Sequence, residues 1–161
     1  MTDLPKLVTD LRARGWTLAT AESCTGGMVA VAITDVPGSS DVFQRGYVTY
    51  SNAAKIDLLG VQKSTLSAEG AVSEDVAIQM AVGALDGARA DIAVSITGIA
   101  GPGGSEFKPE GRVCFGLATR DNAPFAETIE FGPRGRSAVR SAARDHALEL
   151  VAAHLLQNAQ K

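Results

Sequence analysis

A serine and a cysteine stand side by side in a glycine-rich segment near the N-terminus. Ser23 and Cys24 follow an apolar run over residues 16–20, and the sequence Thr-Gly-Gly at 25–27 leads into a small-residue helix predicted over 28–34. A turn from strand to helix leaves backbone N–H groups without helical partners, and such amides can stabilise an oxyanion. The segment therefore predicts a nucleophile, although Ser and Gly in a turn that only satisfies backbone geometry would look the same.

A serine nucleophile needs a base, which is usually histidine. His146 and His154 both lie in a helix predicted over 137–157, where a surface or core-edge role is the simpler interpretation. Tyr50 and Lys55 are the remaining candidates, because they run together from a strand end into the first turn of a helix. A lysine can act as a base only if burial lowers its pKa from about 10.4 toward 7. Without a shared pocket, Tyr50 would be a packed aromatic residue and Lys55 a solvated one.

Cys24 is a rival nucleophile, because a helix N-terminus lowers the pKa of a thiol. Its other interpretation is a small buried apolar residue. Cys24 and Cys114 are the two cysteines of the chain, and neither belongs to a CxxC pair. With two histidines on one predicted helix, the ligands for a metal centre are missing, so we expect no metal and no other cofactor.

Three arginines at a spacing of four, Arg136, Arg140 and Arg144, share one face of the last predicted helix. One or two of them could bind a phosphate group, or all three could form a solvated face. The glycine-rich segment 98–104 has neither the Lys-Ser/Thr ending of a P-loop nor the dinucleotide-binding spacing. Binding of a nucleoside triphosphate is therefore weakly supported.

Helices and strands alternate along most of the chain. The hydrophobic periodicity and the capping signals predict helices over 3–14, 28–34, 52–59 (capped by Asn52), 73–88 and 137–157, and strands over 16–20, 43–51, 91–97, 111–119 and 125–131. This order implies a three-layer α/β/α domain with a mixed sheet. Ligands of such sheets bind beyond the carboxyl ends of the strands, where both glycine-rich turns lie, so we expect the two turns to face one pocket.

Length and charge limit the class of protein. With 161 residues, 45% of them hydrophobic, we expect a single domain over 1–161. The net charge of −3 and the absence of a basic cluster argue against nucleic acid and anionic membranes as partners. No apolar run approaches the roughly 20 residues that span a bilayer, and the N-terminus is unlike a signal peptide, so we expect a cytoplasmic protein.

Four motifs, in this order along the chain, resemble those of the CinA C-terminal domain family. They are Thr20-Ala21-Glu22-Ser23-Cys24-Thr25-Gly26-Gly27, Arg45-Gly46-Tyr47-Val48-Thr49-Tyr50-Ser51-Asn52-Ala53-Ala54-Lys55, Gly70-Ala71-Val72-Ser73 and Ser95-Ile96-Thr97-Gly98-Ile99-Ala100-Gly101-Pro102. The resemblance spans nearly the whole chain. It implies a mixed, mostly parallel five-stranded sheet with one antiparallel strand.

The family contains nicotinamide-nucleotide amidohydrolases, which hydrolyse the carboxamide of nicotinamide mononucleotide (NMN) to nicotinate mononucleotide and ammonia without a metal. The resemblance implies Ser23 as the nucleophile and Lys55 and Tyr50 as its activating partners. The residues that it implies for substrate binding are Glu22, Thr25, Gly26, Gly27, Thr97 and Arg136. Two alternatives stay open: a nucleotide-binding or regulatory domain without turnover, and a hydrolase that depends on Cys24. Association into a homo-oligomer is left undecided by the sequence.

Overall fold

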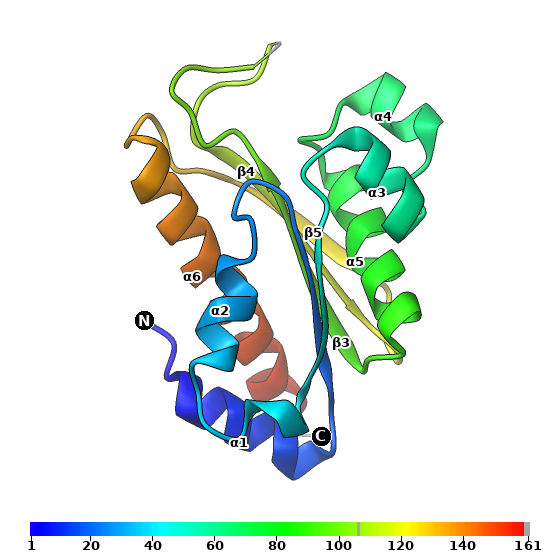
Figure 1. Cartoon of the computed structure of the whole chain (residues 1–161), viewed down its shortest axis with the longest axis vertical. Helices are drawn as coiled ribbons and strands as arrows, with labels where there is room; N and C mark the ends of the chain where they lie inside the picture. The colour runs from blue at the N-terminus through cyan, green and yellow to red at the C-terminus, as the bar shows by residue number, and fades with distance from the viewer. Residues whose placement is uncertain (106, 160–161) are drawn as a thin grey trace.

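A five-stranded sheet lies between two layers of helices in the computed structural model, which describes residues 1–105 and 107–159 (Figure 1). The helices are α1 (Leu4–Arg14), α2 (Met28–Thr34), α3 (Asn52–Leu59), α4 (Lys63–Glu69), α5 (Glu74–Ala88) and α6 (Arg136–Asn158), with a short 3₁₀ turn at Ser39–Asp41. The strands are β1 (Leu18–Glu22), β2 (Phe43–Val48), β3 (Ile92–Gly98), β4 (Arg112–Thr119) and β5 (Phe125–Glu130). None of these helices is long and apolar enough to cross a bilayer.

The strand order is β2-β1-β3-β4-β5. β1 pairs in parallel with both β2 and β3, whereas β4 is antiparallel to β3 and to β5. β5 therefore runs in the same direction as the first three strands, and β4 is the single reversed strand. The predicted fold class, a three-layer α/β/α arrangement with a mixed and mostly parallel sheet of five strands, is confirmed.

The two faces of the sheet carry side chains of different size. Large residues such as Leu18, Ile96 and Phe115 pack toward α1, α2 and α6, while the opposite face presents mostly alanines to α5. The small residues let α5 approach closely: a Cβ at Gly116 of β4 would lie 2.3 Å from the backbone oxygen of Ala77. The hydroxyl of Ser95 donates to that same oxygen at 2.6 Å, which fixes α5 against the sheet.

The first strand begins later than the sequence predicts. Gly15, with a φ of 64°, ends α1, and the amide of Trp16 donates to the Leu11 carbonyl as part of that cap. The Thr17 amide donates to the Asp91 carboxylate at 2.8 Å rather than to a neighbouring strand. Strand pairing therefore starts at Leu18 and extends to Glu22, so the prediction of a strand over 16–20 is wrong by two residues at each end.

Three features in the middle of the chain also differ from the sequence predictions. The N-cap of α3 is Ser51, whose hydroxyl accepts the amide of Ala54 at 3.0 Å, and not Asn52. The helix α4 was not predicted, because none of its seven residues is buried and it has no apolar stripe. The strand predicted over 43–51 ends at Val48, since the chain must leave the sheet to reach the cap of α3.

Candidate active site

The two glycine-rich turns lie at the same edge of the sheet. β1 and β3 are adjacent and parallel, so the turn after Glu22 and the loop after Gly98 both leave from their carboxyl ends (Figure 1). The amide of Ser23 donates to the carbonyl of Ile96 at 3.0 Å and holds the two segments together. This is the edge at which the sequence predicts a pocket.

Successive residues at the end of β1 point to different layers of the fold. Glu22 lies on the side of α2, where its carboxylate accepts the amides of Val29 at 2.9 Å and Ala30 at 3.2 Å. Ser23 lies on the side of α3, where it meets Lys55. The strand therefore uses one carboxylate to fix the beginning of a helix and presents the next residue to the opposite layer.

Lys55 brings an amine to the serine hydroxyl. Its Nζ lies 2.9 Å from the Oγ of Ser23 and donates to the carbonyl of Thr49 at 2.7 Å. Thr49 is itself fixed to β1, because its amide donates to the carbonyl of Glu22 at 2.9 Å. The side chain of Lys55 is only 1% exposed, and Ser23 is 8% exposed. The structure thus joins two of the predicted catalytic residues across 32 positions of sequence.

Burial lowers the pKa of Lys55 from its ordinary value to about 8. The cause is desolvation, which penalises the charged ammonium form. Among the described residues no carboxylate lies within ion-pair distance of the amine to offset that cost. With a pKa of about 8, roughly a tenth of Lys55 is neutral at pH 7, and this form can accept a proton from Ser23.

Burial favours the neutral, reactive form of the Lys55 amine but the protonated, unreactive form of the Cys24 thiol. The side chain of Cys24 is buried, and burial raises the pKa of the thiol to about 11. The thiol is therefore protonated at neutral pH and a poor nucleophile. The geometry favours Ser23 over its neighbour.

The backbone amides of the turn divide into used and free donors. The amide of Gly26 donates to the carbonyl of Ser23, and that of Met28 to the carbonyl of Thr25. Within the part of the chain that the structure describes, no acceptor pairs with the amides of Cys24, Thr25 and Gly27. These three N–H groups are the available donors for an oxyanion next to Ser23.

Arg136 and Tyr50 contact each other at the exposed surface of this edge of the sheet, and not at Ser23. Tyr50 is 61% exposed, and its hydroxyl accepts from the guanidinium of Arg136 at 2.8 Å. The same guanidinium donates to the carbonyl of Gly101 at 2.7 Å, so Arg136 connects the loops that follow β2 and β3. No hydrogen bond joins Tyr50 to Ser23 or Lys55 in the described structure.

Two threonines predicted to bind substrate are buried. The hydroxyl of Thr97, at the end of β3, donates to the carbonyl of Ala71 at 2.8 Å and fixes the segment before α5. The hydroxyl of Thr25 is buried and has no hydrogen-bond partner among the described residues. Both side chains thus lie in the wall of the site, and the roles predicted for them stay predictions.

Arg140, one turn into α6 from Arg136, contacts the turn that follows β1. Its Nε donates to the carbonyl of Cys24 at 3.0 Å, and its Nη2 lies 3.4 Å from the carbonyl of Thr25. The sequence shows Arg140 only as a member of the arginine series with a spacing of four. That pattern cannot distinguish an arginine that braces a loop from a solvated one, and Arg140 was not predicted as a site residue.

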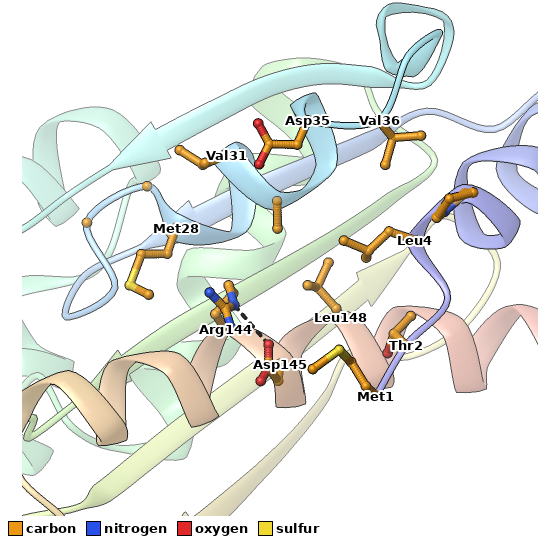
Figure 2. A pocket seen from close by; sticks show the side chains of 14 residues that line it. Met1, Thr2, Leu4, Met28, Val31, Asp35, Val36, Arg144, Asp145 and Leu148 are labelled. Atoms are coloured by element: carbon orange, nitrogen blue, oxygen red, sulfur yellow. Dashed lines mark hydrogen bonds and ion pairs between the residues drawn. The ribbon is translucent and has the colours of Figure 1, made fainter.

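A cavity lies on the other side of the turn (Figure 2). It measures about 560 Å³ and is lined by residues of α1, α2 and α6 together with Gly26 and Gly27. Neither Ser23 nor Lys55 lines it. Within it, Arg144 pairs with the neighbouring Asp145 at 2.8 Å and makes no hydrogen bond to the turn (Figure 2). Position and chemistry therefore separate this cavity from the Ser23–Lys55 pair.

Other groups capable of catalysis lie elsewhere. His146 contacts Glu127 and the ring of Phe115, and His154 stacks on Trp16. Over residues 1–105 and 107–159, no three His, Cys, Asp or Glu side chains are grouped as ligands for a metal ion. The groups that the described structure brings together at the turn after β1 are a serine hydroxyl, a lysine amine and free backbone amides.

Comparison with known proteins agrees with this arrangement. "Nicotinamide-nucleotide amidohydrolase PncC" of Escherichia coli is 54% identical over 149 residues, which cover 92% of this chain and 90% of that protein. A "CinA-like protein" of Chloroherpeton thalassium is 55% identical over 125 residues, which cover 75% of this chain and 30% of that longer protein.

Solved structures share the fold along almost the whole chain. The competence/damage inducible protein CihA of Agrobacterium tumefaciens superposes with a TM-score of 0.90 at 46% identity, covering 95% of this chain and 96% of that one. The model of the CinA C-terminal domain matches residues 3–155. The chain therefore belongs to the CinA C-terminal domain family.

Proposed function

We propose that this protein is a nicotinamide-nucleotide amidohydrolase, which converts NMN and water into nicotinate mononucleotide and ammonia. The observation that carries the proposal is the buried contact of 2.9 Å between the Lys55 amine and the Ser23 hydroxyl. The Escherichia coli relative, which is named a nicotinamide-nucleotide amidohydrolase, supports the choice of substrate. We extend the proposal to the cytoplasm as the site of this reaction.

The first half of the reaction forms an acyl enzyme. Neutral Lys55 takes the hydroxyl proton of Ser23 while the Oγ attacks the carboxamide carbon. The negative charge that develops on the carbonyl oxygen is stabilised by the free amides of Thr25 and Gly27. Collapse of the tetrahedral intermediate breaks the C–N bond, and the ammonium of Lys55 returns the proton to the nitrogen that leaves as ammonia.

The second half uses water and the same groups. Neutral Lys55 takes a proton from a water molecule, whose oxygen attacks the ester carbonyl between Ser23 and the nicotinoyl group. The same two amides hold the second oxyanion. When the ester C–O bond breaks, Ser23 regains its proton from Lys55, and nicotinate mononucleotide leaves as a carboxylate.

Arg136 is the group we propose for the phosphate of NMN. It is exposed at the rim, and a guanidinium binds phosphate more strongly than it binds a backbone carbonyl, so a substrate could replace Gly101 as its acceptor. Tyr50, held by Arg136, would line the same entrance. The turn at 25–27 would bind the carboxamide oxygen, with Thr97 in the wall and Glu22 holding α2 behind it.

The direct test is ammonia release from the purified protein with NMN, nicotinamide riboside and nicotinamide. We expect NMN to be hydrolysed in the presence of a chelator, and the two substrates without phosphate to react much more slowly. Saturable binding of NMN without ammonia release would reject the enzyme and favour the binding domain. Preference for nicotinamide over NMN would reject recognition of the phosphate.

Ser23→Ala tests the nucleophile. We expect hydrolysis to fall by at least about 1,000-fold, because the hydroxyl forms the covalent bond, while folding and NMN binding stay near wild type. Calorimetric titration with NMN and thermal unfolding provide the controls. Activity above about a tenth of wild type, or loss of activity on thiol alkylation, would move the role to another residue such as Cys24.

A further inference from the structure

The turn that carries the nucleophile is built from backbone that has little stiffness of its own. Gly26 and Gly27 have φ values of 57° and 106°, in the left-handed region that favours glycine. Glycine gives the chain access to this shape but also to many others. An oxyanion site needs its N–H groups fixed in direction before the charge develops. Some other part of the fold must therefore hold this turn.

Arg140 meets that requirement from α6. It donates to two successive carbonyls of the turn, those of Cys24 and Thr25. In a trans peptide the C=O and the following N–H point in opposite directions. A carbonyl of Cys24 directed at Arg140 therefore directs the amide of Thr25 away from it. This amide is one of the three free donors in the turn that follows Ser23.

The guanidinium of Arg140 has no carboxylate partner over residues 1–105 and 107–159 that competes with the carbonyls of Cys24 and Thr25. Arg140 is half-buried, and no carboxylate of the described residues lies within ion-pair distance of it. Burying part of a cation without a carboxylate is costly unless its donors are used. Arg144, one turn further along α6, instead pairs with Asp145 and touches neither carbonyl (Figure 2). The two arginines therefore differ in partner although they share a face of the helix.

We infer that Arg140 is a positioning residue for the proposed amidohydrolase reaction: it holds the peptide planes of residues 24–26 so that the Thr25 amide faces the oxyanion formed at Ser23. Arg140 does not contact the substrate. Its contribution belongs to the transition state, so its loss lowers kcat and leaves KM close to wild type. This inference rests on the proposed function but can be tested without the proposed substrate.

Kinetics of Arg140→Gln, Arg140→Lys and the control Arg144→Gln with NMN give the first test. Because removal of one oxyanion donor costs about 100- to 1,000-fold, we expect a misdirected donor in Arg140→Gln to lower kcat by about 10- to 100-fold. Arg140→Lys keeps the charge but not the planar pair of donors, and its kcat should lie between those of Arg140→Gln and wild type. Arg144→Gln should keep kcat within about threefold of wild type. A rise in KM with unchanged kcat would overturn the inference, because Arg140 would then be binding substrate.

Covalent labelling of Ser23 by an alkyl fluorophosphonate gives a second test that does not depend on NMN. The Ser23 Oγ–P bond forms as fluoride leaves, Lys55 takes the serine proton, and the phosphoryl oxygen occupies the oxyanion position. Labelling followed by intact mass should slow at least tenfold in Arg140→Gln and not in Arg144→Gln, with Arg140→Lys between them. If NMN is not hydrolysed but labelling follows this order, the proposed substrate is wrong and the role of Arg140 stands. Thermal unfolding shows whether each variant is folded. If NMN is hydrolysed, and a folded Arg140→Gln or Arg140→Lys labels at the wild-type rate, the role proposed for Arg140 is wrong.

Discussion

Lys55 can serve as a base because the fold leaves its amine buried without a carboxylate. In a Ser-His-Asp triad the aspartate orients the histidine and stabilises the imidazolium that forms during the reaction. A carboxylate beside Lys55 would instead raise the pKa of the amine and keep it protonated. Here the near partners of the amine are a hydroxyl and a carbonyl, both neutral. The burial that lowers the pKa of Lys55 therefore suits it to the proposed role of base without a carboxylate partner.

The pH dependence of the reaction follows from that pKa. The neutral amine is the active form, so kcat/KM should rise with pH, reach half of its plateau near the pKa of about 8, and level off above it. Initial rates of ammonia release from pH 6 to 9.5, at NMN concentrations well below KM, would give the profile. A rate that falls through this range would contradict the assignment of the neutral amine.

Lys55→Arg separates basicity from charge. Arginine keeps the cation but cannot lose its proton, so we expect kcat to fall at least about 100-fold. The matched control is Lys63→Arg at the exposed start of α4, which should leave kcat unchanged. If Lys55→Arg keeps a near-normal kcat, Lys55 is not the base and Tyr50 becomes the candidate.

At the scale of secondary structure, α2 depends on one carboxylate. The helix has seven residues, and two amides of its first turn bind Glu22. Glu22→Gln replaces one acceptor oxygen by an NH₂ group that faces a donor, and should lower the free energy of unfolding by about 1–3 kcal/mol in chemical denaturation. Glu130→Gln is the control, since its exposed ion pair with Arg112 contributes at most about 1 kcal/mol.

The same variant distinguishes two roles for Glu22. As a capping residue it should leave KM for NMN near wild type while stability falls. Unchanged stability with a several-fold rise in KM would instead support the substrate-binding role that the sequence resemblance implies.

Periodicity predicts the elements that bury an apolar stripe and fails where burial gives no signal. The long helix α6 and the strand β3 were predicted within a residue or so, because α6 buries regularly spaced apolar side chains and β3 is a continuous buried run. α4 has no fully buried residue, and only Leu66 packs partly against the core, so its sequence resembles a loop. The last two residues of β1 were missed because Glu22 is charged, and a buried carboxylate indicates a turn unless its partners, the amides of Val29 and Ala30, are known.

The candidate site is predictable only in part, for a related reason. A nucleophile in the turn follows from a strand, a Ser and two glycines in sequence. Lys55 as its partner does not follow, because the contact spans 32 positions and depends on how α3 packs on the sheet. The residues alone left Tyr50 and Lys55 as candidates for the base, and the resemblance to a family implied both as activating partners of Ser23. Arg140 was missed because its acceptors are backbone carbonyls, which no side-chain pattern records.

On the scale of the whole molecule, the site forms where all three layers meet. Ser23, the proposed nucleophile, directly follows β1, Lys55, the proposed base, lies on α3 on one face of the sheet, and α6 on the other face contacts the turn through Arg140 (Figure 1). Each contact joins segments far apart in the sequence. A change in the packing of either helical layer would therefore move one member of the site relative to the others, which couples activity to the integrity of the fold.

The buried amine also has a cost for the stability of the whole protein. The folded state holds the Lys55 proton only up to a pH of about 8, whereas an unfolded lysine holds it up to 10.5. Below the lower value both states are protonated, and the folded state bears the full cost of burying a cation. Between the two values the unfolded state binds more protons, so the contribution of Lys55 to the free energy of unfolding rises with pH.

Lys55→Met removes this titration while keeping the length of the side chain. The difference in free energy of unfolding between wild type and Lys55→Met should therefore shift in favour of wild type by about 2 kcal/mol from pH 7 to pH 10, since each pKa unit corresponds to about 1.4 kcal/mol. Urea denaturation of both proteins at each pH measures it, and other titrating groups cancel in the difference. At pH 7 we expect the inactive variant to be at least as stable as wild type, because methionine bears no cost of burying a charge. A constant difference across this range would show that Lys55 titrates at its ordinary pKa in the folded protein, and would remove the physical basis for its role as the base.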